Sequence, residues 1–362
     1  MKYKSILIGF INKKQNKKKC IENLKELKTL IKNLKNIIII KKFIQRIRKI
    51  NSKTYIGKGK IYEIKKFIIK NNINFIIFDD KISSIQYKNI EKYMNYNIKI
   101  IDRTQIILKI FKKRSRNYNS IIQIKLAENK YLLTKLNKMW SHLKRQKGGI
   151  NFKGPGEKEL ESDKRLIKNK IYILKKKTKK INTQINTQTK NRKYINQISI
   201  IGYTNSGKST ISNLILKKNF NIINNKVFST INTKTKKAYI NNKIILITDT
   251  VGFIKKLPKE LLNSFNTTLY SIIKSNIILS ILDLSSLFIE DYIIYIYNIY
   301  KKYKINNNKI INIFNKTDIN IYNKKKIKSL IIKYNIKNYI FFNYKLNINI
   351  IINKITNILK FL

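Results

Sequence analysis

Apolar and polar positions in the first hundred residues form two alternating kinds of segment. Short runs rich in isoleucine predict strands, and longer amphipathic stretches between them predict helices. The predicted strands are residues 5–11, 36–43, 74–78 and 97–101, and the predicted helices are residues 21–34, 60–70 and 84–94. Such alternation is typical of a largely parallel sheet. The pattern therefore predicts a small α/β domain over residues 1–118.

A different spacing follows, in which the core positions lie three and four residues apart. The positions are Ile122, Leu126, Asn129, Leu133, Leu136, Trp140 and Leu143, and then Ile167, Ile171, Leu174, Thr178, Ile181 and Ile185. Both series are heptad-like. Residues 148–156 separate them and contain four glycines and Pro155, which a helix interior does not tolerate. We therefore expect an antiparallel helical hairpin over residues 119–196, with arms of about 35–40 Å.

The hairpin also carries a basic surface. Its tip is residues 148–156, and positive side chains flank the tip on both arms, at Lys144, Arg145, Lys147, Lys164 and Arg165. Positive charge on exposed helices suits contact with nucleic-acid phosphates. The family resemblance described below implies that the tip is an RNA probe.

From residue 197 to residue 362 the strand–helix alternation returns, which predicts one nucleotide-binding α/β domain with a mostly parallel sheet and flanking helices. A buried strand at 198–201 is followed by a loop that fits the pattern G-x-x-x-x-G-K-[ST], and a helix is expected from Thr210. The loop reads Gly202-Tyr203-Thr204-Asn205-Ser206-Gly207-Lys208-Ser209. Glycines let such a loop wrap phosphates closely, so that its N–H groups face them. Lys208 is expected to reach the β- and γ-phosphates, and the Ser209 hydroxyl is expected to ligate Mg²⁺.

Two further segments follow in the order that a GTPase needs. The strand at 244–247 leads into Asp249-Thr250-Val251-Gly252, where the carboxylate can hold Mg²⁺ and the Gly252 N–H can sense the γ-phosphate. The other segment is the polar loop Phe228-Ser229-Thr230-Ile231-Asn232, which lies in the sequence between the glycine-rich loop and Asp249. From this loop Thr230 could close on Mg²⁺. The predicted metal ligands are Ser209, Thr230 and Asp249, and the residues expected to act in hydrolysis are Lys208, Thr230 and Gly252.

The last segment selects the base. The strand at 310–314 ends in Asn315-Lys316-Thr317-Asp318. A carboxylate at Asp318 can accept hydrogen bonds from both N1–H and the N2 amine of guanine, whereas adenine offers an acceptor at N1 and no N2 amine. Paired hydrogen bonds of this kind discriminate by about 10⁴–10⁵. The sequence therefore predicts GTP rather than ATP as the substrate.

Composition and charge bear on partners and compartment. The 362 residues include 79 Lys and Arg but only 18 Asp and Glu, a formal net charge of +61, which favours a polyanionic partner such as RNA. Residues with AT-rich codons dominate the chain, so we ascribe about half of the basic excess to genome composition, an estimate of our own. The single Cys20 excludes a disulfide framework. Apolar runs are far shorter than the ~18 residues of a membrane span, so we expect a soluble protein. We also expect it to be cytoplasmic and monomeric.

These segments together resemble the HflX family of ribosome-associated GTPases. The likeness rests on the four nucleotide-site segments, on Met139-Trp140-Ser141-His142-Leu143-Lys144-Arg145-Gln146, on the glycine-rich tip with Glu157, Leu160, Glu161, Asp163, Lys164 and Arg165, and on Phe253 and Leu257-Pro258. It also includes Ile77-Phe78-Asp79-Asp80 and Ile101-Asp102-Arg103-Thr104 in the first domain. The resemblance implies binding to the large ribosomal subunit and its rRNA, and the splitting or recycling of stalled ribosomes.

The chain also departs from the family pattern. Many members carry a further small domain after the G domain, for which this chain has no room. Asn343-Tyr344-Lys345 stands where GTPases usually have Ser-Ala-Lys to support the base, and Asn232-Thr233 stands where the family usually has Asp-Pro. Two alternatives to ribosome splitting therefore stay open: another RNA-linked GTPase acting in subunit assembly, and a GTP-independent RNA-binding protein with a decayed G domain. The residues that argue against decay are the intact Lys208, Ser209, Thr230, Asp249 and Asp318.

Overall fold

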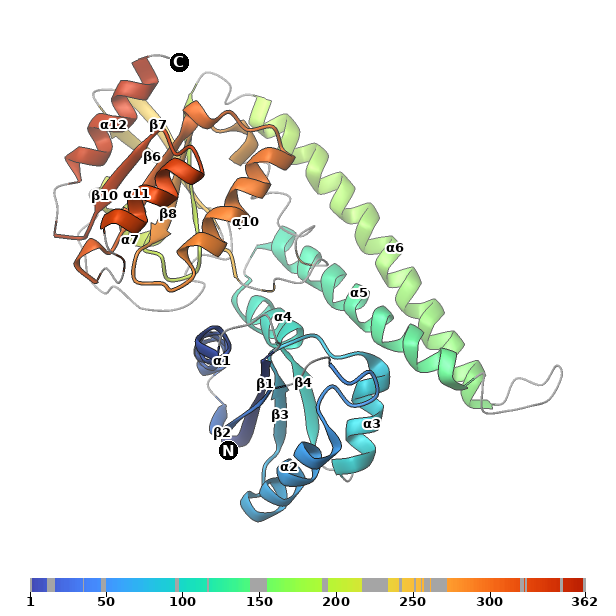
Figure 1. Ribbon diagram of the computed structural model, residues 1–362. Helices are drawn as coiled ribbons and strands as arrows, with labels where there is room; N and C mark the ends of the chain where they lie inside the picture. The colour runs from blue at the N-terminus through green and yellow to red at the C-terminus, as the bar shows by residue number, and fades with distance from the viewer. Residues whose placement is uncertain are drawn as a thin grey trace. The chain divides into compact units, whose positions relative to one another are not determined.

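A computed structural model gives the fold of the chain (Figure 1). The residues that the structure describes are 2–11, 17–34, 36–46, 50–94, 98–115, 117–143, 155–190, 195–216, 234–240, 243–250, 252–254, 256, 261, 272–319, 322, 324–345 and 348–360. Two compact units are present. The first comprises Met1–Lys180 with Lys256–Ser264, and the second comprises Ile181–Lys255 with Phe265–Leu362. The predicted N-terminal domain and most of the predicted hairpin thus fall in the first unit.

A four-stranded parallel sheet forms the centre of the first unit, in the order β2-β1-β3-β4. Its strands are β1 (Tyr3–Ile11), β2 (Ile37–Arg46), β3 (Phe75–Phe78) and β4 (Lys99–Asp102), and the helices that connect and follow them are α1 (Lys17–Lys32), α2 (Lys58–Asn71), α3 (Ser84–Met94) and α4 (Arg103–Arg114). The strand and helix predictions for this region are confirmed, and the ends shift by at most four residues.

Both faces of this sheet are covered. Side chains of β1 and β3 that point one way pack with Ile61 and Ile64 of α2 and Ile90 of α3. Helices α1 and α4 pack together and lie against strands of the sheet, with Leu24, Leu27 and other apolar residues buried. Asp102 ends β4 and caps α4 in a capping box with Gln105. The end of β4 is therefore fixed in place, which matters for the contacts that follow.

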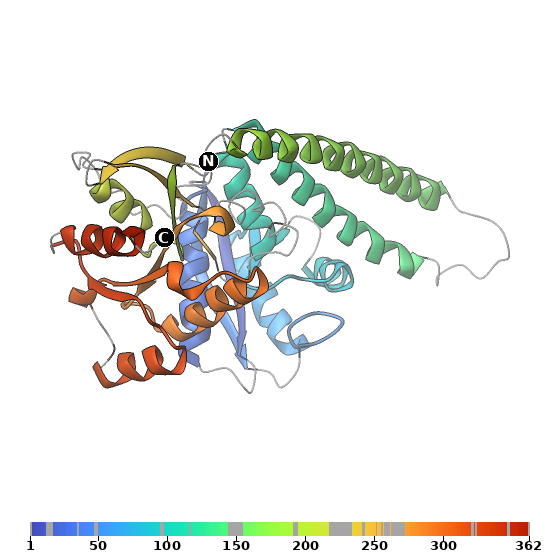
Figure 2. The same cartoon turned by 90° about the horizontal axis from the view of Figure 1, so that it is seen from above.

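Two long helices, α5 (Tyr118–Leu143) and α6 (Pro155–Lys190), run side by side and antiparallel (Figures 1 and 2). Their inward stripes follow the predicted seams. On α6, Ile171 and Ile181 are buried and Ile167, Leu174 and Thr178 are half-buried, whereas most of their neighbours are exposed. The predicted hairpin is thus present. Helix α6 begins at Pro155, so the last two residues of the predicted tip are helical, and proline suits a first helical position. Residues 144–154 lie outside the described part.

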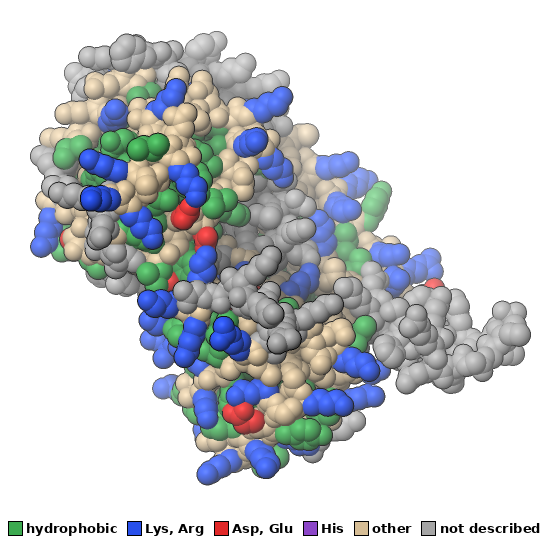
Figure 3. Space-filling model, viewed as in Figure 1, with side chains coloured by type: hydrophobic (Ala, Val, Ile, Leu, Met, Phe, Trp, Pro, Cys, Tyr) green, Lys and Arg blue, Asp and Glu red, His purple; other side chains and the backbone are tan. Residues whose placement is uncertain are grey.

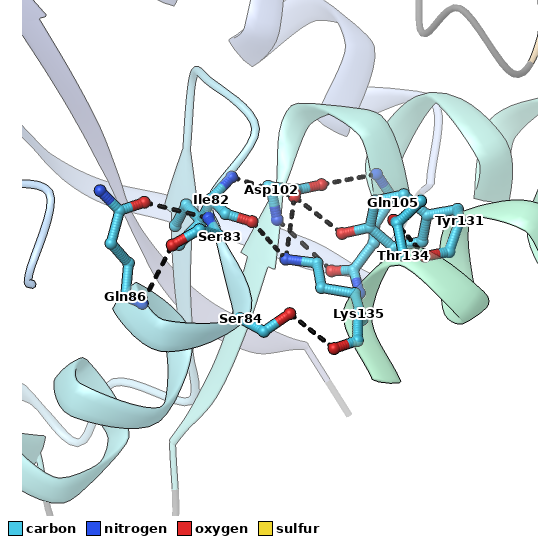
Figure 4. Close-up of polar contacts among 9 residues, drawn as sticks. All are labelled: Ile82, Ser83, Ser84, Gln86, Asp102, Gln105, Tyr131, Thr134 and Lys135. Atoms are coloured by element: carbon cyan, nitrogen blue, oxygen red, sulfur yellow. Dashed lines mark hydrogen bonds and ion pairs between the residues drawn. The ribbon is translucent and has the colours of Figure 1, made fainter. Parts of the chain in front are cut away.

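Polar contacts fasten the middle of α5 to the end of β4 and to the segment that leads into α3 (Figure 4). Tyr131 donates its hydroxyl hydrogen to Asp102 over 2.7 Å, and Lys135 Nζ lies 3.4 Å from the same carboxylate and donates to the Ile82 carbonyl over 2.7 Å. Ser84 Oγ donates to the Lys135 carbonyl over 2.6 Å. Helix α5 of the hairpin is therefore tied to the sheet of the first unit by several polar contacts.

The second unit contains a six-stranded sheet in the order β10-β9-β8-β5-β7-β6. All neighbouring strands are parallel except β6, which pairs antiparallel with β7. The strands are β5 (Asn196–Gly202), β6 (Lys234–Ile240), β7 (Lys243–Asp249), β8 (Ile277–Asp283), β9 (Ile310–Asn315) and β10 (Tyr339–Phe342). Every residue of β8 and β9 is buried, as expected for central strands of a parallel sheet.

Helices cover both faces of this second sheet. Helices α7 (Lys208–Ile215) and α12 (Asn349–Lys360) contribute Ile211, Ile215, Ile351 and Ile355 to the core on one face. Helices α10 (Ile289–Lys302) and α11 (Lys324–Lys333) contribute to the core on the other face. The predicted α/β fold with a mostly parallel sheet is confirmed, although α7 begins two residues before the predicted Thr210. Among the described residues, no helix is long and apolar enough to span a membrane.

Candidate functional site

The first part of the site is the loop that joins β5 to α7. It leaves the middle of the sheet, where β5 lies between β8 and β7. Gly202 and Gly207 have φ angles of 154° and 95°. A Cβ on Gly202 would lie 2.6 Å from the Ile281 carbonyl oxygen, and one on Gly207 would collide with the side-chain amide of Asn315. Only glycine fits both positions, so the loop backbone can approach a ligand closely.

Lys208 is a buried cation at the start of α7, with 7% of its surface exposed. Its Nζ donates to the Tyr203 carbonyl over 2.5 Å. Burial lowers the pKa of Lys208 to about 8, the nearby Asp249 carboxylate opposes that shift, and Lys316 adds to it. An anionic ligand would favour the charged form of this side chain, so its surroundings suit a phosphate.

Two predicted metal ligands, Ser209 in the first turn of α7 and Asp249 at the end of β7, lie together. Ser209 Oγ donates to Asp249 Oδ2 over 3.1 Å. Thr250 fixes the end of β7, because its hydroxyl donates to the Ile200 carbonyl over 2.6 Å. A hydroxyl and a carboxylate are hard oxygen donors of the kind that Mg²⁺ binds together with phosphate and water. The pair therefore fits the ion.

Gly252 lies directly against the phosphate-binding loop. A Cβ at this position would be 2.8 Å from Lys208 Nζ and 3.1 Å from the Thr204 Cα. The next residue, Phe253, donates its N–H to the Gly202 carbonyl over 3.0 Å and accepts the Thr204 N–H over 2.9 Å. The segment after β7 is thus joined to the loop by two backbone hydrogen bonds, which hold Gly252 beside the Lys208 ammonium.

The Phe253 ring packs into a group of aromatic side chains. Its centroid lies 5.5 Å from that of Tyr295 and 6.4 Å from that of Tyr203. Tyr203 in turn stacks on Tyr292 of α10, with centroids 3.7 Å apart. The sequence motifs did not reveal this group, because Tyr292 and Tyr295 lie in a helix of ordinary amphipathic pattern. The side chain of Phe253 therefore offers a packing surface and no hydrogen-bonding group.

The predicted base-binding segment follows β9 and contacts the loop through Asn315. Asn315 Nδ2 donates to the Ser206 carbonyl over 2.8 Å. Lys316 adopts a positive φ of 62°, and its Nζ lies 2.6 Å from Asp283 Oδ2. Asp318 is exposed in the short helix Thr317–Ile319. Its carboxylate is therefore free of the protein core and open to a ligand.

Asn343, at the start of the predicted base-supporting loop, lies next to this segment. Phe342 at the end of β10 pairs with Asn315 in the sheet, which brings the two loops together. Asn343 Nδ2 lies 3.3 Å from Thr317 Oγ1 and donates to it. Tyr344 and Lys345 are exposed in the turn that follows, and the Lys345 N–H donates to Asn343 Oδ1 over 3.0 Å. Parallel pairing thus gathers the strand ends that carry Gly202, Asp249, Asn315 and Asn343.

Asp283, at the same edge of the sheet as these strand ends, was not among the residues predicted from the sequence. Asp283 ends the buried strand β8 and holds Lys316. The sequence did carry a signal for Asp283, because this acidic residue directly follows a run of six apolar or small residues. Other predicted residues cannot be placed: the segment Phe228-Ser229-Thr230-Ile231-Asn232 and Val251 lie outside the described residues, as do Lys144, Arg145 and Lys147.

Three stretches of the chain match known protein families. Residues 21–112 match the family described as GTP-binding GTPase N-terminal, and residues 114–192 match the GTP-binding GTPase middle region. Residues 197–316 match the family described as 50S ribosome-binding GTPase. The breaks between these matches lie near the predicted limits at residues 118 and 196.

Whole-chain relatives decide the family. GTPase HflX of Flavobacterium psychrophilum is 40% identical over 313 residues, which are 86% of this chain and 75% of the relative. GTPase HflX of Caldanaerobacter subterraneus is 33% identical over 318 residues, or 87% of this chain and 72% of the relative. This chain belongs to the HflX family of GTPases. As an HflX-family GTPase, it binds GTP and hydrolyses it, so the predicted family and activity are confirmed.

Solved structures support the fold of this HflX-family chain. A GTP-binding protein from the hyperthermophilic archaeon Sulfolobus solfataricus, in complex with GDP, is similar with a TM-score of 0.52 and 20% identity, over 99% of each chain. A structure described as the SsGBP and GDP complex has a TM-score of 0.54 and 22% identity, over 99% of this chain and 98% of that one. At such identity the likeness concerns the fold alone.

Proposed function

We propose that this HflX-family GTPase is a Mg²⁺-dependent switch that binds the large ribosomal subunit in its GTP state and splits or recycles stalled ribosomes. The observation that carries the nucleotide part is the gathering of Lys208, Ser209, Asp249 and Asn315 at one sheet edge. The ribosomal part rests on the family to which residues 197–316 belong. Work on ribosomes would place the protein in the cytoplasm.

In this proposal each group has a separate task at the nucleotide. The N–H groups of Gly202–Thr210 cradle the phosphates, and Lys208 neutralises the β- and γ-phosphates. Ser209, Asp249 and Thr230 hold Mg²⁺, which offsets charge on the phosphate oxygens. Phe228-Ser229-Thr230-Ile231-Asn232 and Asp249-Thr250-Val251-Gly252 respond to the γ-phosphate. These roles are supported by the contacts of Ser209, Asp249 and Gly252 described above.

The segments that follow β9 and β10, at the same edge of the sheet, recognise the base. Asp318 accepts hydrogen bonds from guanine. Asn315 and Lys316 hold the segment in place through their contacts with the Ser206 carbonyl and with Asp283. Asn343-Tyr344-Lys345 supports the base from the neighbouring loop, which is consistent with the hydrogen bond between Asn343 and Thr317. Hydrogen bonds to both guanine N–H groups provide the discrimination against ATP.

Separated ribosomal subunits and intact ribosomes test the ribosomal part. The protein is centrifuged with large subunits, small subunits or whole ribosomes, with GDP or a non-hydrolysable GTP analogue, at about 150 mM salt, where non-specific phosphate contacts are weakened. We expect co-sedimentation with the large subunit in the GTP-analogue state, and conversion of whole ribosomes to subunits. Binding to large subunits without any splitting would favour a role in subunit assembly. No subunit binding would overturn the proposal.

A further inference from the structure

A pocket of about 770 Å³ lies in the second unit, at the edge of the sheet where β9 and β10 begin. It is bordered by the end of α10, the segment before β9 and the residues that follow α11, and its lining includes Tyr297, Tyr334, Lys301, Lys304, Lys337 and Asn308. The nucleotide-binding loops follow the opposite ends of the strands. Since β9 runs from Ile310 to Asn315, the two edges are about 17 Å apart along this strand. The pocket is therefore separate from the GTP site.

The charged side chains that line this pocket are all positive. Lys301, Lys304 and Lys337 are exposed, no described carboxylate pairs with them, and the lining contains no Asp or Glu. The nearby Glu290 is already bound, because Lys333 Nζ lies 2.8 Å from its Oε1. Cations gathered without counter-charge attract an anion and repel one another in its absence. The pocket therefore suits a ligand that carries phosphates.

Two helix ends border the pocket without opposing an anion there. Free carbonyl oxygens at the C-terminal end of a helix carry partial negative charge. The last carbonyls of α10 accept the N–H groups of residues 303–305, and those of α11 accept the N–H groups of residues 334–336. Lys304 and Asn335 have φ angles of 51° and 48°, as in a Schellman motif. These carbonyls are therefore satisfied within the chain, and the lysines set the sign of the pocket.

Two tyrosine rings lie next to each other in the lining. Tyr297 and Tyr334 are half-buried, and their ring centroids are 6.4 Å apart. The Tyr334 hydroxyl donates to Glu290 Oε1 over 3.1 Å, and Tyr297 packs edge-on against the buried Tyr300 with centroids 5.4 Å apart. Because these contacts already hold the rings, a base can stack on them with little further loss of side-chain freedom.

The combination of lysines, rings and amides distinguishes between possible polyanions. A duplex hides the faces of its bases, and an acidic peptide has no base to stack, whereas a single strand offers both phosphates and unstacked bases. The exposed side chains of Asn298, Asn307 and Asn308 also line the pocket, and amides can donate to and accept from base edges. The lining therefore fits single-stranded RNA better than the other two.

We propose that this pocket binds a segment of single-stranded RNA, with phosphates on Lys301, Lys304 and Lys337 and a base stacked on Tyr334 beside Tyr297. The inference goes beyond the proposed function, because it gives the G domain an RNA contact of its own. This contact requires neither the hairpin tip nor bound GTP.

Fluorescence anisotropy with the full chain and a labelled single-stranded RNA of about 12 nucleotides tests the pocket. The salt is about 150 mM, where general charge attraction is weakened, and no GTP is added. In Tyr334→Ala the affinity should fall about tenfold, because stacking on one ring is lost. Affinity for an RNA duplex with the same number of phosphates should stay at the parental value. Tyr334→Phe keeps the ring and should bind the single strand as the parent does.

A pair of triple variants separates the pocket from the charge of the whole molecule. Replacement of Lys301, Lys304 and Lys337 by alanine should weaken the single strand about tenfold or more. The matched control replaces three exposed lysines elsewhere in the same unit, Lys237, Lys243 and Lys325, and should change the affinity by less than about twofold. Both variants alter exposed side chains, so both should fold.

Photocrosslinking gives a second measurement that charge alone cannot produce. RNA containing 5-iodouridine is irradiated with the parent protein, and mass spectrometry identifies the attached peptides. We expect attachment at Tyr334 or Tyr297. Crosslinks only at other sites would overturn the proposal.

The remaining outcomes also decide. Equal losses in the two triple variants, or parental affinity in Tyr334→Ala, would reduce the binding to general charge and overturn the inference. An acidic peptide of equal charge that displaces the RNA and binds Tyr334→Ala equally well would identify a protein partner instead, which also overturns it. GTP affinity and sedimentation with large subunits test the proposed function separately, since a parent that fails both can still bind the single strand through this pocket.

Discussion

Lys208 illustrates how one side chain can be poorly placed for folding and well placed for binding. Its buried ammonium donates to the Tyr203 carbonyl over 2.5 Å, and burial lowers its pKa to about 8. We predict that Lys208→Ala weakens both GTP and GDP by about 100-fold or more, because charge-assisted bonds to phosphate are lost. The variant leaves the buried Asp249 carboxylate without this nearby positive charge, but Asp249 keeps its hydrogen bond from Ser209, so the fold should persist. Calorimetry with a thermal melt of the same sample checks this, and parental affinity in a folded variant would contradict it.

Asp318 governs the choice of base at the same scale. Its carboxylate is exposed, so a change there should leave stability unaltered. Asp318→Asn replaces one acceptor with a donor that faces the N–H groups of guanine. We predict that GTP affinity falls by about 100-fold and that xanthosine triphosphate, which presents an acceptor instead, gains affinity. Competition binding with both nucleotides measures the change. An unaltered preference would mean that another residue holds the base.

Cys20 provides a test with a defined pH dependence. The thiol is 4% exposed, and burial together with Asp79 raises its pKa from 9.0 to about 11. The folded protein should therefore react with iodoacetamide at pH 8.5 at least about tenfold more slowly than the protein in urea. Because the folded pKa is the higher one, this group's contribution to stability is complete below pH 9 and declines as the pH rises toward 11. Equal labelling rates in the two states would show that the thiol is accessible and reactive.

At the scale of elements, the sequence alone was enough to predict the strands, helices and loops whose formation depends on local residue patterns. The isoleucine-rich strands, the loop around Gly202 and Gly207 and the two heptad seams all follow from periodicity or from backbone geometry. Contacts between elements could not be predicted in this way. Asp283 with Lys316, and Asp79 with Lys256, join residues 33 and 177 positions apart, and no local pattern marks such pairs. They depend on strand order and on which ends meet, which a single sequence does not specify.

The hairpin is the element whose function is most open to experiment. Helix α6 begins at Pro155, so residues 148–154 can be replaced by glycine and serine without altering either helix. We predict that this variant keeps parental GTP affinity and binds large subunits at least about tenfold more weakly at 150 mM salt, where the general charge contribution is reduced. Lys176→Ala on the exposed face of α6 is the control for a lost charge. Co-sedimentation equal to the parent would show that the tip is not the RNA probe.

For the whole molecule, the formal net charge of +61 has to be separated from specific recognition. Lys and Arg side chains are spread over much of the face in Figure 3 rather than gathered in one patch, and Asp and Glu appear at few places there. A spread charge attracts any polyanion and adds little selectivity. Specificity for a ribosomal state must therefore come from shape and from the switch segments, which makes stimulated hydrolysis more informative than binding alone.

The hydrolysis rate itself is the last test. Where Ras-like GTPases place a water-orienting glutamine, this chain has Phe253, whose ring packs near Tyr203 and Tyr295 and can neither donate nor accept the needed bonds. The isolated protein should therefore hydrolyse GTP slowly. We predict at least about tenfold stimulation by large subunits, or about 1.4 kcal/mol of barrier, and little by bulk RNA of equal phosphate content, in a phosphate-release assay. Equal stimulation by both would indicate ordering by charge alone. No stimulation by either would leave the trigger to another partner, with GTP binding alone acting as the switch.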